Sequence, residues 1–232
     1  MGKEHHFSTS ASDLRAAVLG ASDGLVSNFC LLLGIAGSGI ASREALLAGA
    51  AGLVAGACSM ALGEWLSMRN SRELARAEMK KEARELREQP AAERLELQRI
   101  YEARGLSPED AREVTLRLMA DPEIALATHA REELGIDPQE LGGSAWEAAL
   151  TSFFLFALGA IIPVFPYIFL AGTPGIIAST VVSAVGLFVV GAAITLMTGR
   201  SPLMSGLRQV LFGLAAAAVT FGVGWLIGVN VT

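Results

Sequence analysis

The chain has 232 residues, of which 52% are hydrophobic and only 18% are charged, and its 18 Lys and Arg against 23 Asp and Glu give a net charge of −5. This composition is too apolar for an ordinary soluble domain, and its acidic balance gives no reason to expect nucleic acid as a partner. The only two cysteines, Cys30 and Cys58, lie in apolar runs, so we expect no disulfide framework.

Two apolar segments follow a short polar N-terminus. Residues 1–13 form a polar tail that lacks the apolar run of a signal peptide. Leu14 to Gly39 and Ala45 to Met68 are each long enough for the ~20 residues that a helix needs to cross a bilayer. We therefore predict a cytoplasmic tail and then two transmembrane helices within residues 14–68.

The composition changes abruptly over residues 69–143, which hold 13 of the 18 basic and 17 of the 23 acidic residues. Helix-forming residues continue the second apolar helix into water as far as Gln89, and Pro90 ends it. Pro and capping residues then predict three further helices: Ala91 to Arg104, a helix capped by Ser107 that runs to about Met119, and one from Asp121 to near Gly135. This segment is expected to be a helical domain inserted between two membrane helices.

Residues 144–232 contain the remaining apolar segments, which predict transmembrane helices three to five. They are Ala145 to Leu170, which Pro163 and Pro166 interrupt, Gly175 to Met197 and Gly206 to Val229, with turns expected at Gly172–Gly175 and Thr198–Pro202. The expected fold class is an all-α membrane protein with five transmembrane helices and a helical cytoplasmic domain between the second and third.

The basic residues predict the orientation. One side of the five predicted spans holds the whole insert together with Lys3, Arg15, Arg200 and Arg208, whereas the other side holds only Arg43. Because cytoplasmic loops carry the excess of Lys and Arg, we expect a cytoplasmic N-terminus and insert and a C-terminus outside. The Ala-, Arg- and Gly-rich composition without a targeting segment favours a bacterial plasma (inner) membrane.

Four carboxylates of the insert form two Glu-x-x-Glu pairs, Glu82 with Glu85 and Glu93 with Glu96, on either side of Pro90. Residues three apart share a helix face, so helices that fold back at Pro90 can converge the four on one cation. The alternative is a solvated face, which is what a Glu- and Arg-rich helix usually forms. The Glu-x-x-His repeat of di-iron enzymes is missing, which argues against an oxidase.

A few polar or soft side chains lie inside the predicted membrane helices. Asp23 is near mid-bilayer, where an acid must be neutral, paired or exposed to a wet path. Met60, Glu64 and Met68 fall at i, i+4 and i+8, and thioethers with carboxylates suit divalent transition metals. Packing of the methionines, and helix–helix hydrogen bonding by Asp23 and by Asn28 one turn beyond it, are the alternatives to a transport path.

Several motifs together resemble the vacuolar iron transporter family from about Leu14 to the last span. They are Gly20-Ala-Ser-Asp-Gly24, the run from Ala55 to Trp65, the Glu-Leu-Gly near the end of the insert and Ile162-Pro-x-x-Pro-Tyr167. The resemblance implies a five-helix membrane protein that forms a symmetric dimer. It also implies export of Fe²⁺, and often Mn²⁺, from the cytosol in exchange for protons, with a glutamate-built cytoplasmic metal-binding domain.

The resemblance also implies which residues act. The metal ligands would be the two Glu-x-x-Glu pairs and the closing acid, that is, Glu82, Glu85, Glu93, Glu96 and Glu133. The membrane path would use one acid and one thioether, Asp23 and Met60. Where a plant-type member has methionines one turn before the closing acid, this chain has His129 and Ala130. His129 is at i, i+4 to Glu133 and can reach the same metal. Two further acids of the plant-type path are replaced by Ala16 and Gly52, and Glu64 is the candidate substitute.

We therefore predict a transporter rather than an enzyme. It is expected to have no prosthetic group and to bind Fe²⁺, Mn²⁺, Co²⁺ or Zn²⁺ as substrate, with metal ions, protons, the lipid bilayer and a second copy of the chain as partners. Two rival hypotheses are a membrane-anchored iron buffer or sensor without transport, and a membrane-bound di-metal enzyme.

Overall fold

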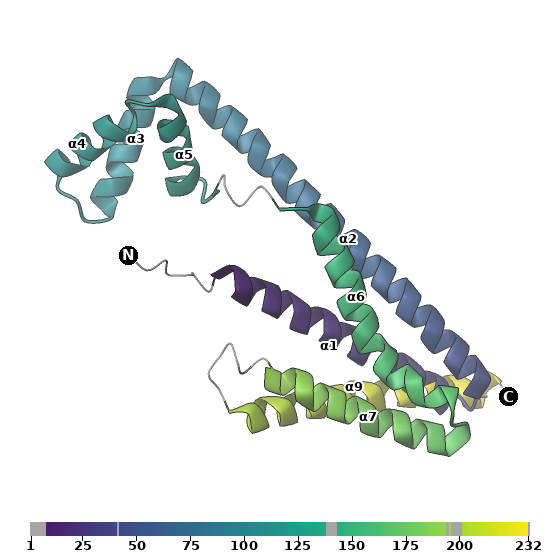
Figure 1. The fold of residues 1–232 in the computed structure, drawn as a ribbon. Helices are drawn as coiled ribbons and strands as arrows, with labels where there is room; N and C mark the ends of the chain where they lie inside the picture. Colours follow the sequence, from purple (N-terminus) through teal and green to yellow (C-terminus); the bar gives the residue numbers. More distant parts are fainter. Residues whose placement is uncertain (1–7, 41, 138–142, 194, 196–200, 232) are drawn as a thin grey trace. The chain divides into compact units, whose positions relative to one another are not determined.

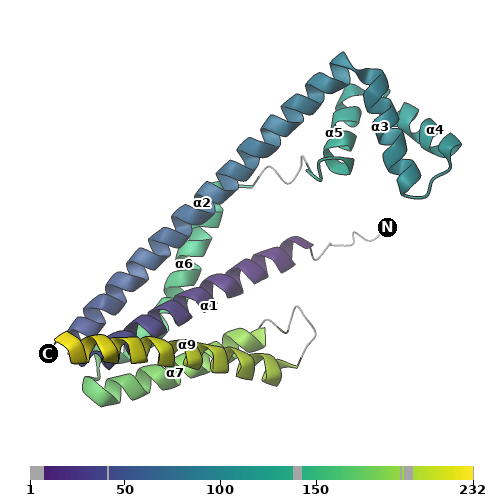
Figure 2. The same cartoon turned by 180° about the vertical axis from the view of Figure 1, so that it is seen from behind.

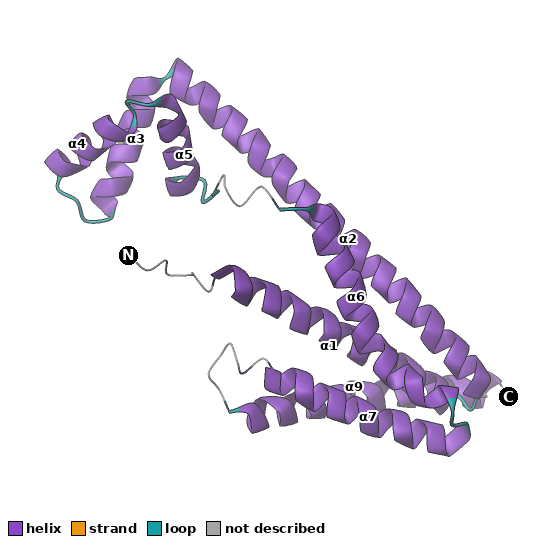
Figure 3. Cartoon of the chain, viewed as in Figure 1, coloured by secondary structure: helices purple, strands orange, loops and turns teal. Residues whose placement is uncertain are grey.

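The computed structural model describes residues 8–40, 42–137, 143–193, 195 and 201–231 (Figure 1). Every regular element within these residues is a helix (Figure 3), which confirms the all-α prediction. In chain order they are α1 (Ser8–Gly37), α2 (Ser42–Glu88), α3 (Pro90–Ala103), α4 (Pro108–Leu118), α5 (Pro122–Glu132), α6 (Ala145–Val164), the 3-10 helix η2 (Phe165–Ile168), α7 (Gly172–Ala193) and α9 (Pro202–Val231).

Within the described residues, five helical stretches are long and apolar enough to cross a membrane, by length and composition. They are Ala17–Gly37, Arg43–Glu88, Ala145–Ile168, Gly172–Ala193 and Pro202–Gly228. Large apolar side chains on them, such as Phe154, Leu158 and Phe212, are exposed on the protein surface. Exposed apolar side chains in such numbers are expected where a helix faces lipid rather than water.

The chain divides into two compact units. The first, here called the apolar unit, comprises Met1–Glu64 and Ala148–Thr232, and the second, here called the insert unit, comprises Trp65–Glu147. The predicted insert, residues 69–143, lies inside the second unit. Each unit is described by itself below.

In the apolar unit α1 packs against α7 and α9 (Figure 2) and also touches α6. The α1–α6 contact is between backbones. A Cβ added at Gly24 of α1 would lie 2.1 Å from the carbonyl oxygen of Phe156, and one at Gly159 of α6 would lie 2.0 Å from that of Ala21. Small residues at such a crossing are what allow two membrane helices to approach closely.

The helix starts of the insert unit are confirmed by their caps. The Ser107 hydroxyl accepts a hydrogen bond from the Asp110 amide at 3.1 Å, and the Asp121 carboxylate accepts one from the Glu123 amide at 2.8 Å. Pro90 stands at the first position of α3, where its missing N–H costs nothing. Because α2 runs without a break to Glu88, its charged half extends the apolar half as a single helix, as predicted.

Three boundary predictions need correction. Helix α9 begins at Pro202 rather than Gly206. Helix α1 begins at Ser8, inside the predicted polar tail, while its candidate membrane span is Ala17–Gly37. Gly172–Gly175 is the first turn of α7 and not a connecting turn. Gly172 at its first position has a left-handed φ of +63°, which glycine adopts without strain. Pro163 lies inside α6, and the chain tightens into η2 only after Val164. Most of the turn predicted at Thr198–Pro202 lies outside the described residues.

Candidate metal centre

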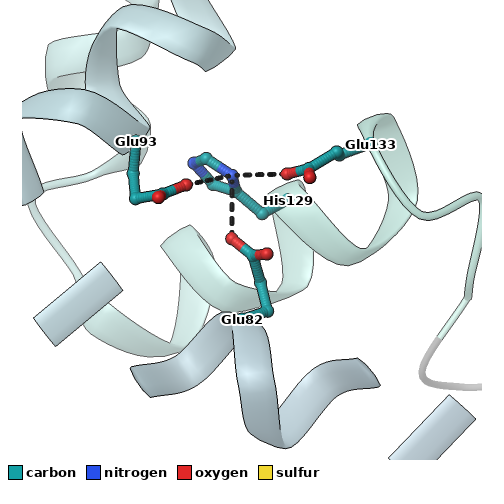
Figure 4. A group of neighbouring side chains, drawn as sticks. All are labelled: Glu82, Glu93, His129 and Glu133. Atoms are coloured by element: carbon teal, nitrogen blue, oxygen red, sulfur yellow. Dashed lines mark hydrogen bonds and ion pairs between the residues drawn. The ribbon is translucent and has the colours of Figure 1, made fainter. Parts of the chain in front are cut away.

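Four side chains of the insert unit converge on one point (Figure 4). Glu82 of α2, Glu93 of α3, and His129 and Glu133 at the C-terminal end of α5 each offer one ligand atom, and these atoms all lie within 4.8 Å of one another. The His129 Nδ1 lies 3.1 Å from a Glu82 oxygen, 3.5 Å from a Glu133 oxygen and 3.9 Å from a Glu93 oxygen. We call these four residues the cluster.

Local structure explains why these residues meet. Pro90 separates α2 from α3, so the chain can turn between Glu82 and Glu93. His129 and Glu133 are one helical turn apart and share a face of α5. Three helices therefore contribute ligands to a site that no single segment can form.

The cluster is buried, yet its polar atoms are poorly paired. His129 has no exposed surface, and the side chain of Glu82 is 3% exposed. Within the described part of the chain, His129 Nε2 and Glu82 Oε1 have no hydrogen-bond partner, since the 3.1 Å approach of Glu82 to Nδ1 lacks the alignment of a hydrogen bond. Buried polar atoms without a partner in the protein are uncommon, and here they leave donor atoms that can bind an ion.

The electrostatics of the cluster also favour a cation. Burial, followed by the negative charges of Glu133, Glu93, Glu85 and Glu96, raises the pKa of Glu82 to about 7. Burial and then the charge of Glu96 raise the pKa of Glu93, and His129 opposes that rise. Three carboxylates held close together, two of them buried, repel one another, and a divalent ion between them removes that repulsion.

The donor set fits a transition-metal ion. Two atoms that bind the same ion at about 2.1 Å lie at most about 4.2 Å apart, so the cluster must contract by a few tenths of an ångström from its present span of up to 4.8 Å. The partly exposed Glu133 at the end of α5 can make that movement. Carboxylate oxygens with one imidazole nitrogen suit Fe²⁺, Mn²⁺, Co²⁺ and Zn²⁺ without strong selection among them.

The other two predicted ligands are not part of the cluster. Glu85 lies 3.7 Å from Lys81 in an ion pair on α2, and Glu96 is exposed on α3. Both nevertheless act on Glu82 through their charge, since each raises its pKa. Their direct ligation of metal stays a prediction.

We expect metal binding to weaken as the pH falls below about 7. A metal ion needs the Glu82 carboxylate ionised, and because its pKa is raised to about 7, a proton occupies it increasingly at lower pH. With one proton displaced per ion, the apparent affinity should drop about tenfold per pH unit below 7 and level off above it. Calorimetric titration of the full chain with Mn²⁺ at several pH values measures this. Glu82→Gln is the control that should make the profile shallower, with the remaining slope due to Glu93, whose pKa is also raised. An affinity that stays constant between about pH 5.5 and 7 would contradict it.

A second polar group lies in the apolar unit. A pocket of about 340 Å³ between α1, α2 and α6 is lined by Asp23, Asn28 and Met60, three of the residues predicted for a transport path. Two hydroxyl side chains, Ser27 and Ser59, also line it. Neither serine was predicted from the sequence, although Ser27 lies one helical turn after Asp23 and Ser59 directly precedes Met60.

Asn28 links three helices. Its buried amide nitrogen donates to the Gly49 carbonyl at 3.1 Å and to the Ala160 carbonyl at 3.0 Å, which ties α1 to α2 and α6. Both amide protons of Asn28 are therefore used in hydrogen bonds between helices, which is the alternative to a role in a transport path. The amide oxygen lies on the side of Gly52, where an added Cβ would be 2.6 Å away.

We expect Asn28→Ala to lower the free energy of unfolding by about 1 kcal/mol, because it removes two hydrogen bonds between helices in an apolar setting. Urea-dependent unfolding of the protein in mixed micelles measures this. Ser27→Ala is the matched control, since the Ser27 hydroxyl donates within its own helix, to the Gly24 carbonyl. Equal stability of Asn28→Ala and the wild type would show that Asn28 is not a structural link.

The remaining path residues lie elsewhere on α2. Glu64 is exposed at the end of the apolar unit and Met68 is half-buried in the insert unit, and neither lines the pocket with Asp23. Asp23 itself is exposed on the protein surface. The pocket thus combines Asp23 and Met60, and the participation of Glu64 and Met68 stays a prediction.

Comparison with known proteins finds consistent similarity over almost the whole chain. The model of the VIT family matches residues 14–225. A vacuolar iron transporter of Acanthamoeba castellanii is 37% identical over 230 residues, covering 96% of this chain and 82% of that protein. Vacuolar iron transporter 1 of Arabidopsis thaliana is 33% identical over 222 residues (94% and 87%), and a vacuolar iron transporter of Centaurea cyanus is 32% identical over 221 residues (95% and 89%).

Proposed function

Because the chain belongs to the VIT family, whose named relatives are iron transporters, we propose that it moves Fe²⁺, and also Mn²⁺, out of the cytosol in exchange for protons. The observation that carries this proposal is the buried cluster of three carboxylates and one imidazole in the insert unit. A chain of this family with such a cluster has both a means of capturing the ion and membrane helices through which to pass it.

Capture is assigned to the insert unit, which we place in the cytosol on the Lys and Arg distribution. Its cluster would bind one ion directly, and the charges of Glu85 and Glu96 beside it would raise the local concentration of cations. The pKa of Glu82 near 7 supports binding that is reversible at cytosolic pH.

Passage through the membrane is assigned to the pocket with Asp23 and Met60, reached by way of Glu64 and Met68 on α2. The Asp23 carboxylate is a hard ligand and the Met60 thioether a soft one, and a divalent transition-metal ion of intermediate character can bind to each in turn. A carboxylate that takes up a metal ion releases its proton, so Asp23 and Glu64 can couple the two movements by competition.

A symmetric dimer is part of the proposal. Asp23 and Ser27 are exposed in the single chain although both lie in apolar α1. An exposed acid is costly against lipid, and a second copy placed over this face would enclose the pocket. For the host membrane we propose a bacterial plasma membrane, on the Ala-, Arg- and Gly-rich composition, with the C-terminus outside.

The experiment that tests transport against mere binding counts ions per protein. Sealed proteoliposomes with the insert unit facing outward are incubated with Fe²⁺ under reducing conditions, and the internal iron is measured over time. A transporter accumulates many ions per chain, and an ionophore releases them. A membrane-anchored buffer or sensor, the rival hypothesis, would hold only a few ions per chain and would show no ionophore-sensitive pool.

A further inference from the structure

The insert unit contains a second site with a different chemistry. A pocket of about 560 Å³ is lined by residues of α2 between positions 65 and 76 and by residues 143–146 at the start of α6. Its lining includes three arginines, Arg69, Arg72 and Arg76, one acid, Glu73, and the rings of Trp65 and Trp146. None of these residues belongs to the cluster or to the proposed path.

Two of the three arginines are available to a ligand. Arg69 is occupied, because its Nε lies 2.9 Å from the Glu73 carboxylate and its guanidinium lies 5.3 Å from the centroid of the Trp65 ring. Arg72 Nη2 is buried and has no hydrogen-bond partner among the described residues. Arg76 is exposed and likewise makes no ion pair within the described ranges. As far as the described residues go, the pocket therefore has uncompensated positive charge, including one guanidinium nitrogen that is sheltered from water.

The start of α6 adds to this charge. The Ser144 hydroxyl, which lines the pocket, accepts a hydrogen bond from the Glu147 amide at 3.3 Å and so caps the helix. The first N–H groups of a helix and its dipole attract an anion. Next to Ser144, a Cβ built on Gly143 would lie 3.3 Å from Arg72 Nη2, so the free guanidinium nitrogen and the helix start are close together.

The two tryptophans indicate where this anion would lie. Their ring centroids are 5.9 Å apart, and Trp146 is largely exposed. Trp146 begins the apolar stretch of α6, and Trp65 precedes the first charged residue of the α2 extension, Arg69. Tryptophan at the end of an apolar helix marks the membrane interface, and basic residues just beyond it lie at the depth of lipid phosphates.

We propose that this pocket binds a phosphate group, supplied by the headgroup of an anionic phospholipid. The guanidinium groups of Arg72 and Arg76 donate hydrogen bonds to the phosphate oxygens, and the start of α6 faces the same charge. Trp65 and Trp146 lie against the glycerol and upper acyl region of the same lipid. The site needs only that α2 and α6 cross a bilayer, so it stands independently of iron transport.

Native mass spectrometry of the full chain tests this, after reconstitution into equal amounts of phosphatidylglycerol and phosphatidylcholine and extraction into mild detergent. The wild type should retain phosphatidylglycerol in preference to phosphatidylcholine. Arg72→Gln with Arg76→Gln should lower that retention about tenfold or more, since the charge-assisted hydrogen bonds to the phosphate are lost. Arg94→Gln with Arg112→Gln, two exposed arginines of the same unit outside the pocket, removes the same charge and should change nothing.

Inorganic phosphate provides the second arm, measured by calorimetry on the detergent-purified chain. One outcome is that the wild type binds inorganic phosphate but shows no preference for phosphatidylglycerol. If the Arg72 and Arg76 double variant then loses phosphate binding and the Arg94 and Arg112 double variant keeps it, the pocket is supported and its ligand is a soluble phosphate. The proposal would be overturned if the wild type shows neither lipid preference nor phosphate binding, or if the two double variants retain phosphatidylglycerol equally. Unfolding temperatures check that each variant folds, and Arg76→Gln alone, at an exposed side chain, should still lower retention several-fold if the double variant does not fold.

Discussion

Replacing Asp23 by Asn is expected to abolish the exchange of Fe²⁺ for protons in proteoliposomes. Asparagine keeps the shape of the side chain and its place in the pocket beside Met60, but it cannot bind a metal ion as an anion or carry a proton. Loss of a ligand and of the titrating group together should lower the rate by a factor of about 100 or more. The measurement is initial Fe²⁺ uptake at a fixed pH gradient.

Glu44→Gln is the matched control for this substitution. Glu44 is an exposed acid in the first turn of α2, in the same apolar unit, and it does not line the pocket. It removes the same charge and should leave uptake within about twofold of the wild type. Undiminished transport by Asp23→Asn would remove Asp23 from the path.

The double substitution Glu82→Gln with Glu93→Gln is expected to lower the Fe²⁺ affinity of the full chain by about a hundredfold or more. Both carboxylates belong to the cluster, and the loss of even supporting groups around a metal typically costs 10–100-fold in affinity. The variant should still fold, because removal of two buried charges that repel each other relieves the cost that raises their pKa values. Anaerobic competition with a metal indicator measures the affinity, and thermal unfolding without metal checks the fold.

Glu85→Gln with Glu96→Gln provides the comparison. These two acids have the same residue type, lie on the same two helices and carry the same charge, but they lie outside the cluster. Their loss should weaken binding only several-fold, through the lost field at Glu82. If the two double variants lost affinity equally, the four Glu-x-x-Glu carboxylates would act as one set and the cluster would be defined wrongly.

The sequence allowed the helices of the insert to be predicted well, for local reasons. Side-chain caps at Ser107 and Asp121, and prolines at the first position of each following helix, act within a few residues of the boundary that they define. The boundary predicted wrongly at Pro163, in contrast, involves a tertiary contact. Pro163 is accommodated in α6 while the Ser179 hydroxyl donates to its carbonyl at 2.7 Å.

The candidate metal site was only partly predictable. The pairs were expected to act as pairs because residues three apart share a helix face. The two residues of a pair, however, point about 60° apart around the helix axis, which is enough for one to face the cluster and the other to face water. Glu82 is buried, whereas Glu85 pairs with Lys81 near the surface. Whether Glu82 or Glu85 faces the cluster depends on the position of His129 on α5, and the sequence of α2 does not determine that position.

The grouping at the proposed path also depends on packing. Asp23, Asn28 and Met60 come from two helices and line one pocket with Phe156 of α6. The stripe of Met60, Glu64 and Met68 follows from helical spacing alone, yet only its first member lines that pocket. Spacing defines a helix face, but the neighbour of that face depends on close crossings such as Gly24 with Gly159.

Coupling of Fe²⁺ movement to proton movement is tested by recording iron uptake and internal pH at the same time. Proteoliposomes with the insert unit outward, loaded with a pH-sensitive dye, receive external Fe²⁺ under reducing conditions. We predict that Fe²⁺ enters while the internal pH rises, and that an acidic interior accelerates entry, because protons leave as the metal arrives. Iron entry with an unchanged internal pH would rule out proton exchange, and no entry beyond the ions bound to the protein would rule out transport.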